Sequence, residues 1–232
     1  YTNNHYYQHE VYTSTANRIT LFPWWSLNFS ADYQFNLLNA DLKDFAYPRR
    51  HSFLFAGATA FDFHKLKMQA SLLSTVVHDE ATRLAHKAAD NKVKWTPTAI
   101  LSYRPFSPID FNLRAFYKRI FRMPTLNDLY YTFIGNTDLE PEYTNQYNIG
   151  FTYGKDFTHT WLKRIEIQTD FYYNEVENKI IATPTSNFFR WTMINLGKVE
   201  IRGVDVAVQT EWQLGRELFL NGRVNYTYQK AQ

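Results

Sequence analysis

The sequence contains no cysteine and only eight glycines among its 232 residues. Without cysteine the chain has no disulfide framework, no thiolate ligand for a metal and no thiol nucleophile. The compartment stays open, because oxidising spaces also contain cysteine-free proteins. A Walker loop, a Rossmann glycine pattern and zinc-ligand spacing are absent as well, so the familiar signatures of nucleotide-binding and zinc enzymes are excluded.

Long apolar runs and a strong excess of one charge are also missing. The 25 Lys and Arg residues nearly balance 22 Asp and Glu residues, which leaves a net charge of +3 and no argument for a nucleic-acid-binding surface. Every apolar run stops well short of the roughly 20 residues that a transmembrane helix needs. A transmembrane β-barrel remains open, because one crossing takes only about 9–11 residues and its alternation keeps the mean hydropathy polar, here −0.45.

Aromatic residues are abundant. They make up 18% of the chain, with 17 Tyr, 19 Phe and 6 Trp, against only 20% charged residues, and this composition excludes a disordered chain. Many of them gather beside short predicted turns, which is typical of an interfacial girdle at a membrane surface. These residues are Phe22, Trp24, Trp25, Phe61, Phe63, Tyr103, Phe106, Tyr153, Phe157, Trp161 and Trp212.

The hydropathy pattern has a period of two along most of the chain. Residues 26–37 alternate without a break, with Leu27 and Phe29 on one face and Asn28 and Ser30 on the other. The same alternation recurs at 143–153, 204–214 and 218–229, more weakly at 51–63, 66–77, 93–104, 110–122 and 163–174, and poorly at 7–18. The pattern predicts an all-β protein with about ten antiparallel strands.

The predicted connections alternate strictly between short and long. Short turns are expected near residues 23, 64–65, 106–110, 155–161 and 214–217, and long loops at 38–50, 78–92, 123–141 and 175–190. Short turns at one end and long loops at the other are typical of an outer-membrane barrel. A soluble sandwich or a carbohydrate-binding sheet is the competing interpretation, although the amide-rich and charge-rich polar face suits a wet lumen better.

One segment carries a recognisable pattern. It runs from Phe121 to Tyr131 as Phe-Arg-Met-Pro-Thr-Leu-Asn-Asp-Leu-Tyr-Tyr, and the positions that define it are Phe121, Arg122, Pro124, Asn136, Leu139, Pro141 and Glu142. The pattern resembles TonB-dependent outer-membrane receptors, in which a strand ending in Phe-Arg-x-Pro leads into an external loop that closes with Asn-x-x-Leu-x-Pro-Glu. A softer match is Asn195-Leu196-Gly197 with Gly203-Val204-Asp205, where the family usually has Glu in place of Asp205.

The resemblance implies a barrel of about 22 strands with an N-terminal plug domain. Ten strands occupy 232 residues, so residues 1–232 are expected to be part of such a barrel, with the plug domain and the closing strands absent. A complete ten-stranded barrel is the alternative, because an even strand number also closes. Proline at positions 124 and 141 is expected to end and restart strand pairing, and the motif residues are expected to shape the loop.

The family implies active uptake at the bacterial outer membrane. Such receptors capture a scarce nutrient complex, for example cobalamin, siderophore-bound iron or haem, and import it with energy delivered through TonB. The Asn-Asp-Leu-Tyr-Tyr run reads closest to cobalamin and iron-complex receptors. A passive channel, an adhesin barrel and a soluble glycan-binding domain are the alternatives, and whether a surface lipoprotein caps the barrel is left open.

Aromatic clusters on the long loops are the binding candidates. They are Tyr130, Tyr131 and Phe133 in one loop and Asn187, Phe188, Phe189 and Arg190 in another, with Trp191 just beyond. Aromatic surfaces with a few hydrogen-bond donors suit large, rigid ligands such as corrinoids, porphyrins or siderophores. Anchoring in the outer leaflet and packing of loop on loop are the alternative roles.

The sequence offers no catalytic residue, metal site or cofactor site. Acids, bases and nucleophiles do not stand out from charges that alternate along strands, so the chain is not expected to be an enzyme. Loop 78–92 carries His78, Asp79, Glu80, His86 and Asp90, but their spacing matches no metal template and predicts hydrated loop charges. His5 and His9 share a face if the first strand forms, without a ligand pattern.

Overall fold

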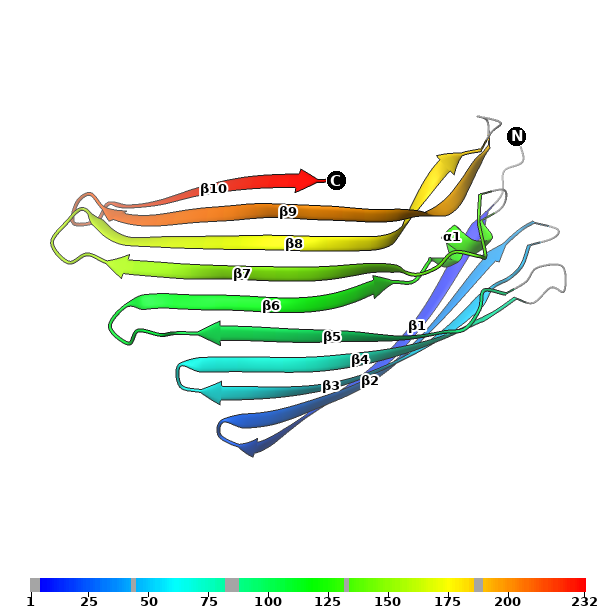
Figure 1. Cartoon of the computed structure of the whole chain (residues 1–232), viewed down its shortest axis with the longest axis horizontal. Helices are drawn as coiled ribbons and strands as arrows, with labels where there is room; N and C mark the ends of the chain where they lie inside the picture. The colour runs from blue at the N-terminus through cyan, green and yellow to red at the C-terminus, as the bar shows by residue number, and fades with distance from the viewer. Residues whose placement is uncertain (1–4, 43–44, 82–87, 132–133, 186–189) are drawn as a thin grey trace.

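The computed structural model describes residues 5–42, 45–81, 88–131, 134–185 and 190–232. These residues form one antiparallel sheet of ten strands, ordered as in the sequence, with one short helix (Figure 1). The elements are β1 (Tyr6–Phe22), β2 (Trp25–Ala40), β3 (Arg49–Phe63), β4 (Leu66–Glu80), β5 (Lys92–Tyr103), β6 (Asp110–Arg122), α1 (Leu126–Tyr130), β7 (Glu142–Asp156), β8 (Leu162–Pro184), β9 (Trp191–Gln213) and β10 (Phe219–Ala231).

The predicted all-β class and the ten strands are confirmed, but several strands run further than their alternation. Residues 175–184 belong to β8 and not to a long loop, and β9 begins at Trp191, so both strands have 23 residues. Beyond Tyr173 the face of β8 that was apolar carries Glu175, and Lys198 lies on the same face of β9. The apolar residues Val176 and Ile180 are buried on the opposite face, so the phase of the alternation reverses although the main-chain pairing continues to the pair Pro184 and Trp191.

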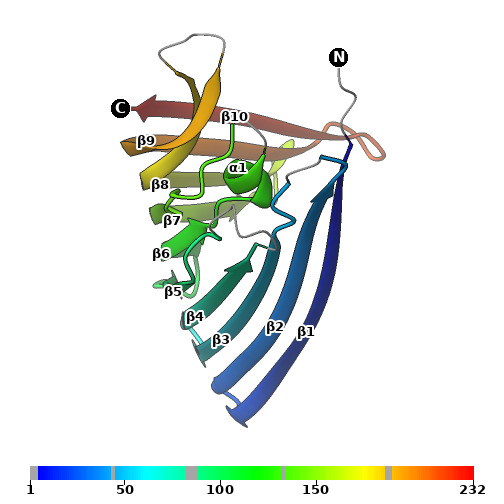
Figure 2. The ribbon, with the colours of Figure 1, turned by 90° about the vertical axis from the view of Figure 1, so that its right-hand side faces the viewer.

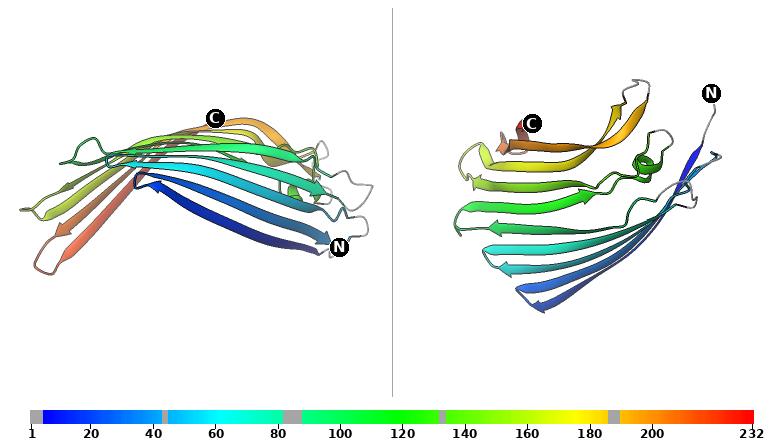
Figure 3. Two further views of the ribbon diagram at one scale, coloured as in Figure 1. Left: turned by 90° about the horizontal axis from the view of Figure 1, so that it is seen from below. Right: turned by 45° about the vertical axis from the view of Figure 1, so that its right-hand side comes forward.

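The sheet is a curved, open wall. Figures 2 and 3 show that its strands bend around one concave side, and α1 lies on that side. The far ends of β8 and β9 turn sharply away from the other strands (Figure 1). The short turns lie at one end of the wall, and the connections after β2, β4, β6 and β8 lie at the other (Figure 1). The connections after β2, β4 and β6 are long, as predicted, whereas the connection after β8 comprises only residues 185–190.

The register assigns the two faces of the wall. The pair Asn36 and Arg50 continues to Asp79, whereas the next pair, Phe35 and His51, points to the opposite face. Leu38 lies two residues beyond Asn36 and packs against α1, so the polar face is the concave one. The convex face carries the apolar positions. Among the described residues no helix has the length and apolar character needed to cross a membrane.

The convex face carries an aromatic cluster at the end with the short turns. Rings of Phe22, Trp24, Trp25, Phe61 and Phe63 stack on one another, with centroids 5.3–6.3 Å apart and interplanar angles of 25° or less. Stacked aromatic rings, two of them tryptophan indoles with a polar N–H group, suit a membrane–water interface. The structure thus brings together the girdle residues predicted on the first three strands.

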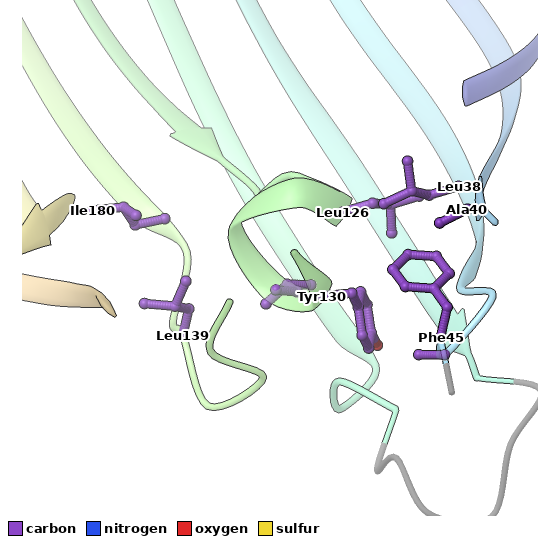
Figure 4. Packing of buried hydrophobic residues seen from close by; sticks show 9 residues of the cluster. Leu38, Ala40, Phe45, Leu126, Tyr130, Leu139 and Ile180 are labelled. Carbon is purple, nitrogen blue, oxygen red and sulfur yellow. The ribbon is translucent and has the colours of Figure 1, made fainter. Parts of the chain in front are cut away.

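The hydrophobic core lies at the opposite end of the wall, under the long loops. Figure 4 shows α1 packed between the wall and the loop after β2. The core residues come from β2, β8, α1 and two loops: Leu38, Ala40, Phe45, Ala46, Leu126, Leu129, Tyr130, Leu139 and Ile180. The loop end is therefore a packed structure and not a set of free loops.

Both edges of the sheet are unpaired within the described residues, because β1 pairs with β2 alone and β10 with β9 alone. Residues 1–232 expressed alone are therefore expected to aggregate or to pair through these edges. Analytical ultracentrifugation measures the association. The variant Val11→Lys, which places a charge on the edge strand β1, should reduce it. A monodisperse monomer without detergent would contradict the prediction.

Candidate functional site

Helix α1 begins the loop that the sequence motif predicted. Thr125 is its N-cap: its hydroxyl accepts a hydrogen bond from the Asp128 amide at 3.1 Å, and the Asp128 carboxylate accepts one from the Thr125 amide at 2.9 Å. This capping box satisfies two amides that a five-residue helix leaves open. The helix turns Leu126 and Leu129 into the core.

A buried ion pair fastens this loop to the wall. Arg50 on β3 donates two hydrogen bonds to Asp79 on β4, at 2.6 and 2.7 Å, and a third to the carbonyl oxygen of Pro124 at 2.6 Å. The exposed fractions are 9% for the arginine side chain and 1% for the aspartate. The paired geometry and the third acceptor satisfy charges that would be costly alone at this depth.

Tyr130 joins α1 to a second loop. Its side chain is 8% exposed, and its hydroxyl accepts a hydrogen bond from the Ala89 amide at 2.8 Å. Burial raises the pKa of the Tyr130 phenol, because the phenolate would lose its hydration there. The predicted ligand residue Tyr130 is thus held inside the core in this structure.

The second half of the motif is bound to the bent hairpin of β8 and β9. The Asn195 side chain accepts a hydrogen bond from the Glu140 amide at 2.8 Å and donates to the Glu140 carbonyl at 2.9 Å and the Asn178 carbonyl at 2.8 Å. Asn136 donates to the Met193 carbonyl at 3.0 Å. The two motif segments recognised in the sequence therefore contact each other directly.

The motif ends in a small electrostatic cluster at the start of β7. Glu142 accepts hydrogen bonds from Arg122 at 3.0 Å and from the Ile180 amide at 3.2 Å. Pro124 and Pro141 are fully buried, and Leu139 is 4% exposed in the core. Each of these residues has a contact that shapes the loop, whereas Phe121 lies on the convex face with Tyr143, at 6.3 Å between ring centroids.

Gly135 explains the turn before Asn136. A Cβ atom at this position would lie 2.6 Å from the carbonyl oxygen of Leu129, so no larger residue fits against the end of α1. Gly203, in the second motif, is restricted in the same way by the Tyr172 ring on the concave face. Asp205 follows on that face, directly opposite Asp170 on β8.

Tyr131 is the described ring of the motif loop that remains open to solvent. Its exposed fraction is 40%, and it stacks on Tyr6 of β1 with centroids 4.9 Å apart and an interplanar angle of 27°. Arg190 and Trp191 are exposed at the tip of the β8–β9 hairpin, Trp191 by 49%. The other predicted contacts, Phe133, Asn187, Phe188 and Phe189, lie outside the described residues.

The charged residues predicted as hydrated loop charges include one buried residue and two exposed strand residues. His78, Asp79 and Glu80 belong to β4, and Asp79 is buried against Arg50, so its assignment as a hydrated charge was wrong. His78 and Glu80 are exposed and lie 3.2 Å apart, and His86 lies outside the described residues. Throughout the described ranges, no group of three or more His, Asp or Glu side chains is arranged to hold a metal ion.

Sequence reasoning missed the pairing of Arg50 with Asp79 and the contact of Ala89. Arg50 and Asp79 were both expected in long loops, and a partner 29 residues away is visible only through the register of β3 and β4. An Arg and an Asp at the loop ends of neighbouring strands were the available signal. The amide of Ala89 has no sequence signal, because any residue there donates the same bond.

Removing one partner of the buried pair is expected to destabilise the loop end. Arg50→Ala or Asp79→Ala should lower the free energy of unfolding by about 3–5 kcal/mol, because each leaves a buried charge without its partner. The double variant Arg50→Met/Asp79→Leu should lose less than either single variant. Urea unfolding of the full-length protein in phospholipid vesicles measures this.

The exposed pair of Lys67 and Asp62, at 2.9 Å, provides the control. Lys67→Ala should change the unfolding free energy by less than about 1 kcal/mol. Equal losses in the Lys67 and Arg50 variants would contradict the role given to burial.

The raised pKa of Tyr130 predicts an alkaline limit. The unfolded phenol ionises near its ordinary pKa of 10.0, whereas the buried phenol stays protonated. The stabilisation that the buried Tyr130 phenol gives the folded state is therefore intact below pH 10 and is lost as the pH rises through the folded pKa. Tyr130→Phe should start about 1 kcal/mol less stable at pH 8, because the Ala89 hydrogen bond is lost, and should fall less steeply above pH 10. Parallel pH slopes in urea unfolding would refute this.

Comparisons with known proteins agree with this architecture. The family model described as TonB dependent receptor-like, beta-barrel, matches residues 1–232. The vitamin B12 transporter BtuB of Vibrio vulnificus (strain YJ016) is 31% identical over 91 residues, which is 39% of this chain and 14% of that protein.

Solved structures show the same fold at low identity. The FrpB iron transporter of Neisseria meningitidis (F5-1 variant) superimposes with a TM-score of 0.75 at 11% identity, over 99% of this chain and 37% of that one. The copper transporter OprC superimposes with a TM-score of 0.72 at 14% identity, over 98% and 38%. The chain thus spans only a minor part of each of these proteins. It belongs to the TonB-dependent receptor family of the bacterial outer membrane, whose members are receptors and transporters, and it forms part of a larger β-barrel.

Proposed function

We propose that this chain supplies wall strands and external loops to a receptor that captures a scarce nutrient complex and imports it with TonB-coupled energy. Cobalamin, siderophore-bound iron and haem are the proposed ligand classes. Family membership supports this proposal, as do a relative named as a vitamin B12 transporter and a structural neighbour named as an iron transporter. The plug domain and the remaining strands are proposed to lie outside these 232 residues.

The observation that carries the proposal is the open Tyr131 ring. Tyr131 directly follows α1. The capping box, the buried ion pair and the core hold this helix in place, so the Tyr131 ring has a fixed position at the loop end of the wall. Tyr6 supports it from behind by stacking. A rigid aromatic surface costs little conformational entropy on binding and suits a large planar ligand.

Arg190 and Trp191 are the proposed second contact. They lie at the tip of the bent β8–β9 hairpin, which Asn195 and Asn136 tie to the same motif loop. A guanidinium beside an exposed indole offers hydrogen-bond donors next to an apolar surface, which matches a rigid ligand with acidic or amide substituents. Phe133, Asn187, Phe188 and Phe189 remain proposed contacts of the same two loops.

A passive channel or an adhesin barrel is the rival function within the outer membrane. Energy dependence separates it from active uptake, because diffusion through a pore continues without TonB. The soluble glycan-binding interpretation is set aside, because the family is an outer-membrane family. A surface lipoprotein partner stays a proposal without a contact to support it.

Binding and uptake by the full-length receptor test the proposal. Radiolabelled cyanocobalamin is the first probe, followed by a ferric siderophore and haemin, in cells with and without TonB. We expect high-affinity uptake of one probe that stops when TonB is deleted. Uptake that is unchanged without TonB, or binding of none of the three probes, would overturn the proposal.

Tyr131→Ala should weaken binding of that probe about tenfold, which corresponds to about 1.4 kcal/mol of lost aromatic contact. Tyr7→Ala is the matched control, because Tyr7 is 55% exposed on the same end of β1 but points to the convex face. If both variants bind equally well, Tyr131 is not a ligand contact.

A further inference from the structure

The convex face of the wall has a groove that the proposed uptake function does not use. It crosses β3, β4, β5 and β6 and encloses about 510 Å³, a volume within the range of small-molecule pockets. Its lining is almost entirely carbon. Among the lining residues are Thr59, Ala70, Ala99, Ala115 and Tyr117.

The register explains the groove. Thr59, Ala70 and Ala99 lie directly opposite one another on three neighbouring strands, so they form a row of small side chains across the wall. Tyr117 is paired with Ala99 on the next strand and closes the row. A row of small residues beside a row of large ones leaves a trough on a sheet surface.

Large side chains form one wall of this trough. On the side of the short turns the neighbouring row is Phe61, Met68 and Leu101, and all three line the groove. The two hydroxyl groups in the row are already satisfied: Trp25 donates its indole hydrogen to the Thr59 hydroxyl at 2.9 Å, and the Tyr117 hydroxyl donates to the Asn145 side-chain oxygen at 3.3 Å. The trough therefore has no open donor or acceptor in this row and selects an apolar occupant.

The position of the trough identifies the occupant. It lies on the apolar convex face, which meets the hydrocarbon of the membrane in this family, and Phe61 belongs both to its wall and to the aromatic cluster beside the short turns. That cluster marks the membrane–water interface. The groove thus opens into the lipid region directly below the headgroups on the side of the short turns.

The trough has a tall wall only on the side of the short turns. The next row on its other side comprises Gly57, Leu72 and Pro97, and Gly57 adds no side chain. An extended alkyl chain suits an apolar trough of this shape, because it needs no hydrogen-bond partner along its length.

We propose that this groove binds one acyl chain of a phospholipid from the leaflet on the side of the short turns. The acyl chain then covers the part of the convex face where the side chains are small. Its headgroup lies at the level of Trp25 and Phe61. The site is independent of the nutrient-binding loops, which lie at the other end of the wall.

Native mass spectrometry of the full-length receptor, exchanged into a mild detergent, tests the proposal. The wild-type protein is expected to retain one phospholipid, and Ala99→Phe, which fills the trough, is expected to lower the retained fraction at least fivefold. Ala115→Phe is the second variant, in case Ala99→Phe fails to fold. Val224→Phe is the control, because Val224 is 69% exposed on the convex face of β10, far from the groove.

Three results would overturn the proposal: equal retention in all folded variants, no lipid on the wild-type protein, or a bound mass equal to detergent alone. A second measurement uses vesicles of phosphatidylethanolamine with brominated acyl chains, which quench tryptophan fluorescence at short range. Quenching of Trp25 fluorescence should decrease in Ala99→Phe and not in Val224→Phe. The variant Trp25→Phe shows which part of the total tryptophan fluorescence comes from Trp25. Equal quenching in both variants would also overturn it.

Discussion

The structure depends on one constraint: every strand must present apolar side chains to one side and polar side chains to the other while its main chain pairs with both neighbours. A main chain in the hydrocarbon region has no water to bind, so its amides and carbonyls must be satisfied within the sheet. The strictly ordered antiparallel register meets this requirement for β2 to β9, and each of β1 and β10 has one unpaired edge within the described residues. It also directs the alternating apolar and polar side chains of β2 to opposite faces of the sheet.

The same constraint separates the two ends of the wall. At the short turns the aromatic rings of β1–β3 stack on the convex face and require little further support. At the other end the strands leave the apolar region, buried apolar residues such as Leu38 and Val77 lie on the concave face, and stability comes from a separate core around α1. The buried pair of Arg50 and Asp79 connects this core to the wall, because the same guanidinium also binds the Pro124 carbonyl.

This arrangement gives the motif residues a division of roles. Pro124, Leu139 and Pro141 are buried, and Asn136 and Glu142 hold the loop to the β8–β9 hairpin, so the motif builds a support. Tyr131 is the neighbouring ring that the support leaves open. A ligand surface on packed loops keeps its geometry, and this reduces the ordering cost of binding.

By itself the sequence determined the strands, their order, the end at which the long loops lie and the family motif, because these follow from local alternation and from residues close together in the chain. Only the tertiary structure decided that Asp79 is buried, that Tyr130 packs inward while Tyr131 stays open, and that Asn195 binds Glu140. The contacts of Asp79 with Arg50, Tyr130 with Ala89 and Asn195 with Glu140 join residues 29 to 55 positions apart, and their partners are set by register and bending of the sheet. The extension of β8 and β9 was hidden for a related reason: beyond Tyr173 the apolar positions move to the other face, where Val176 and Ile180 are buried, although the main-chain pairing continues.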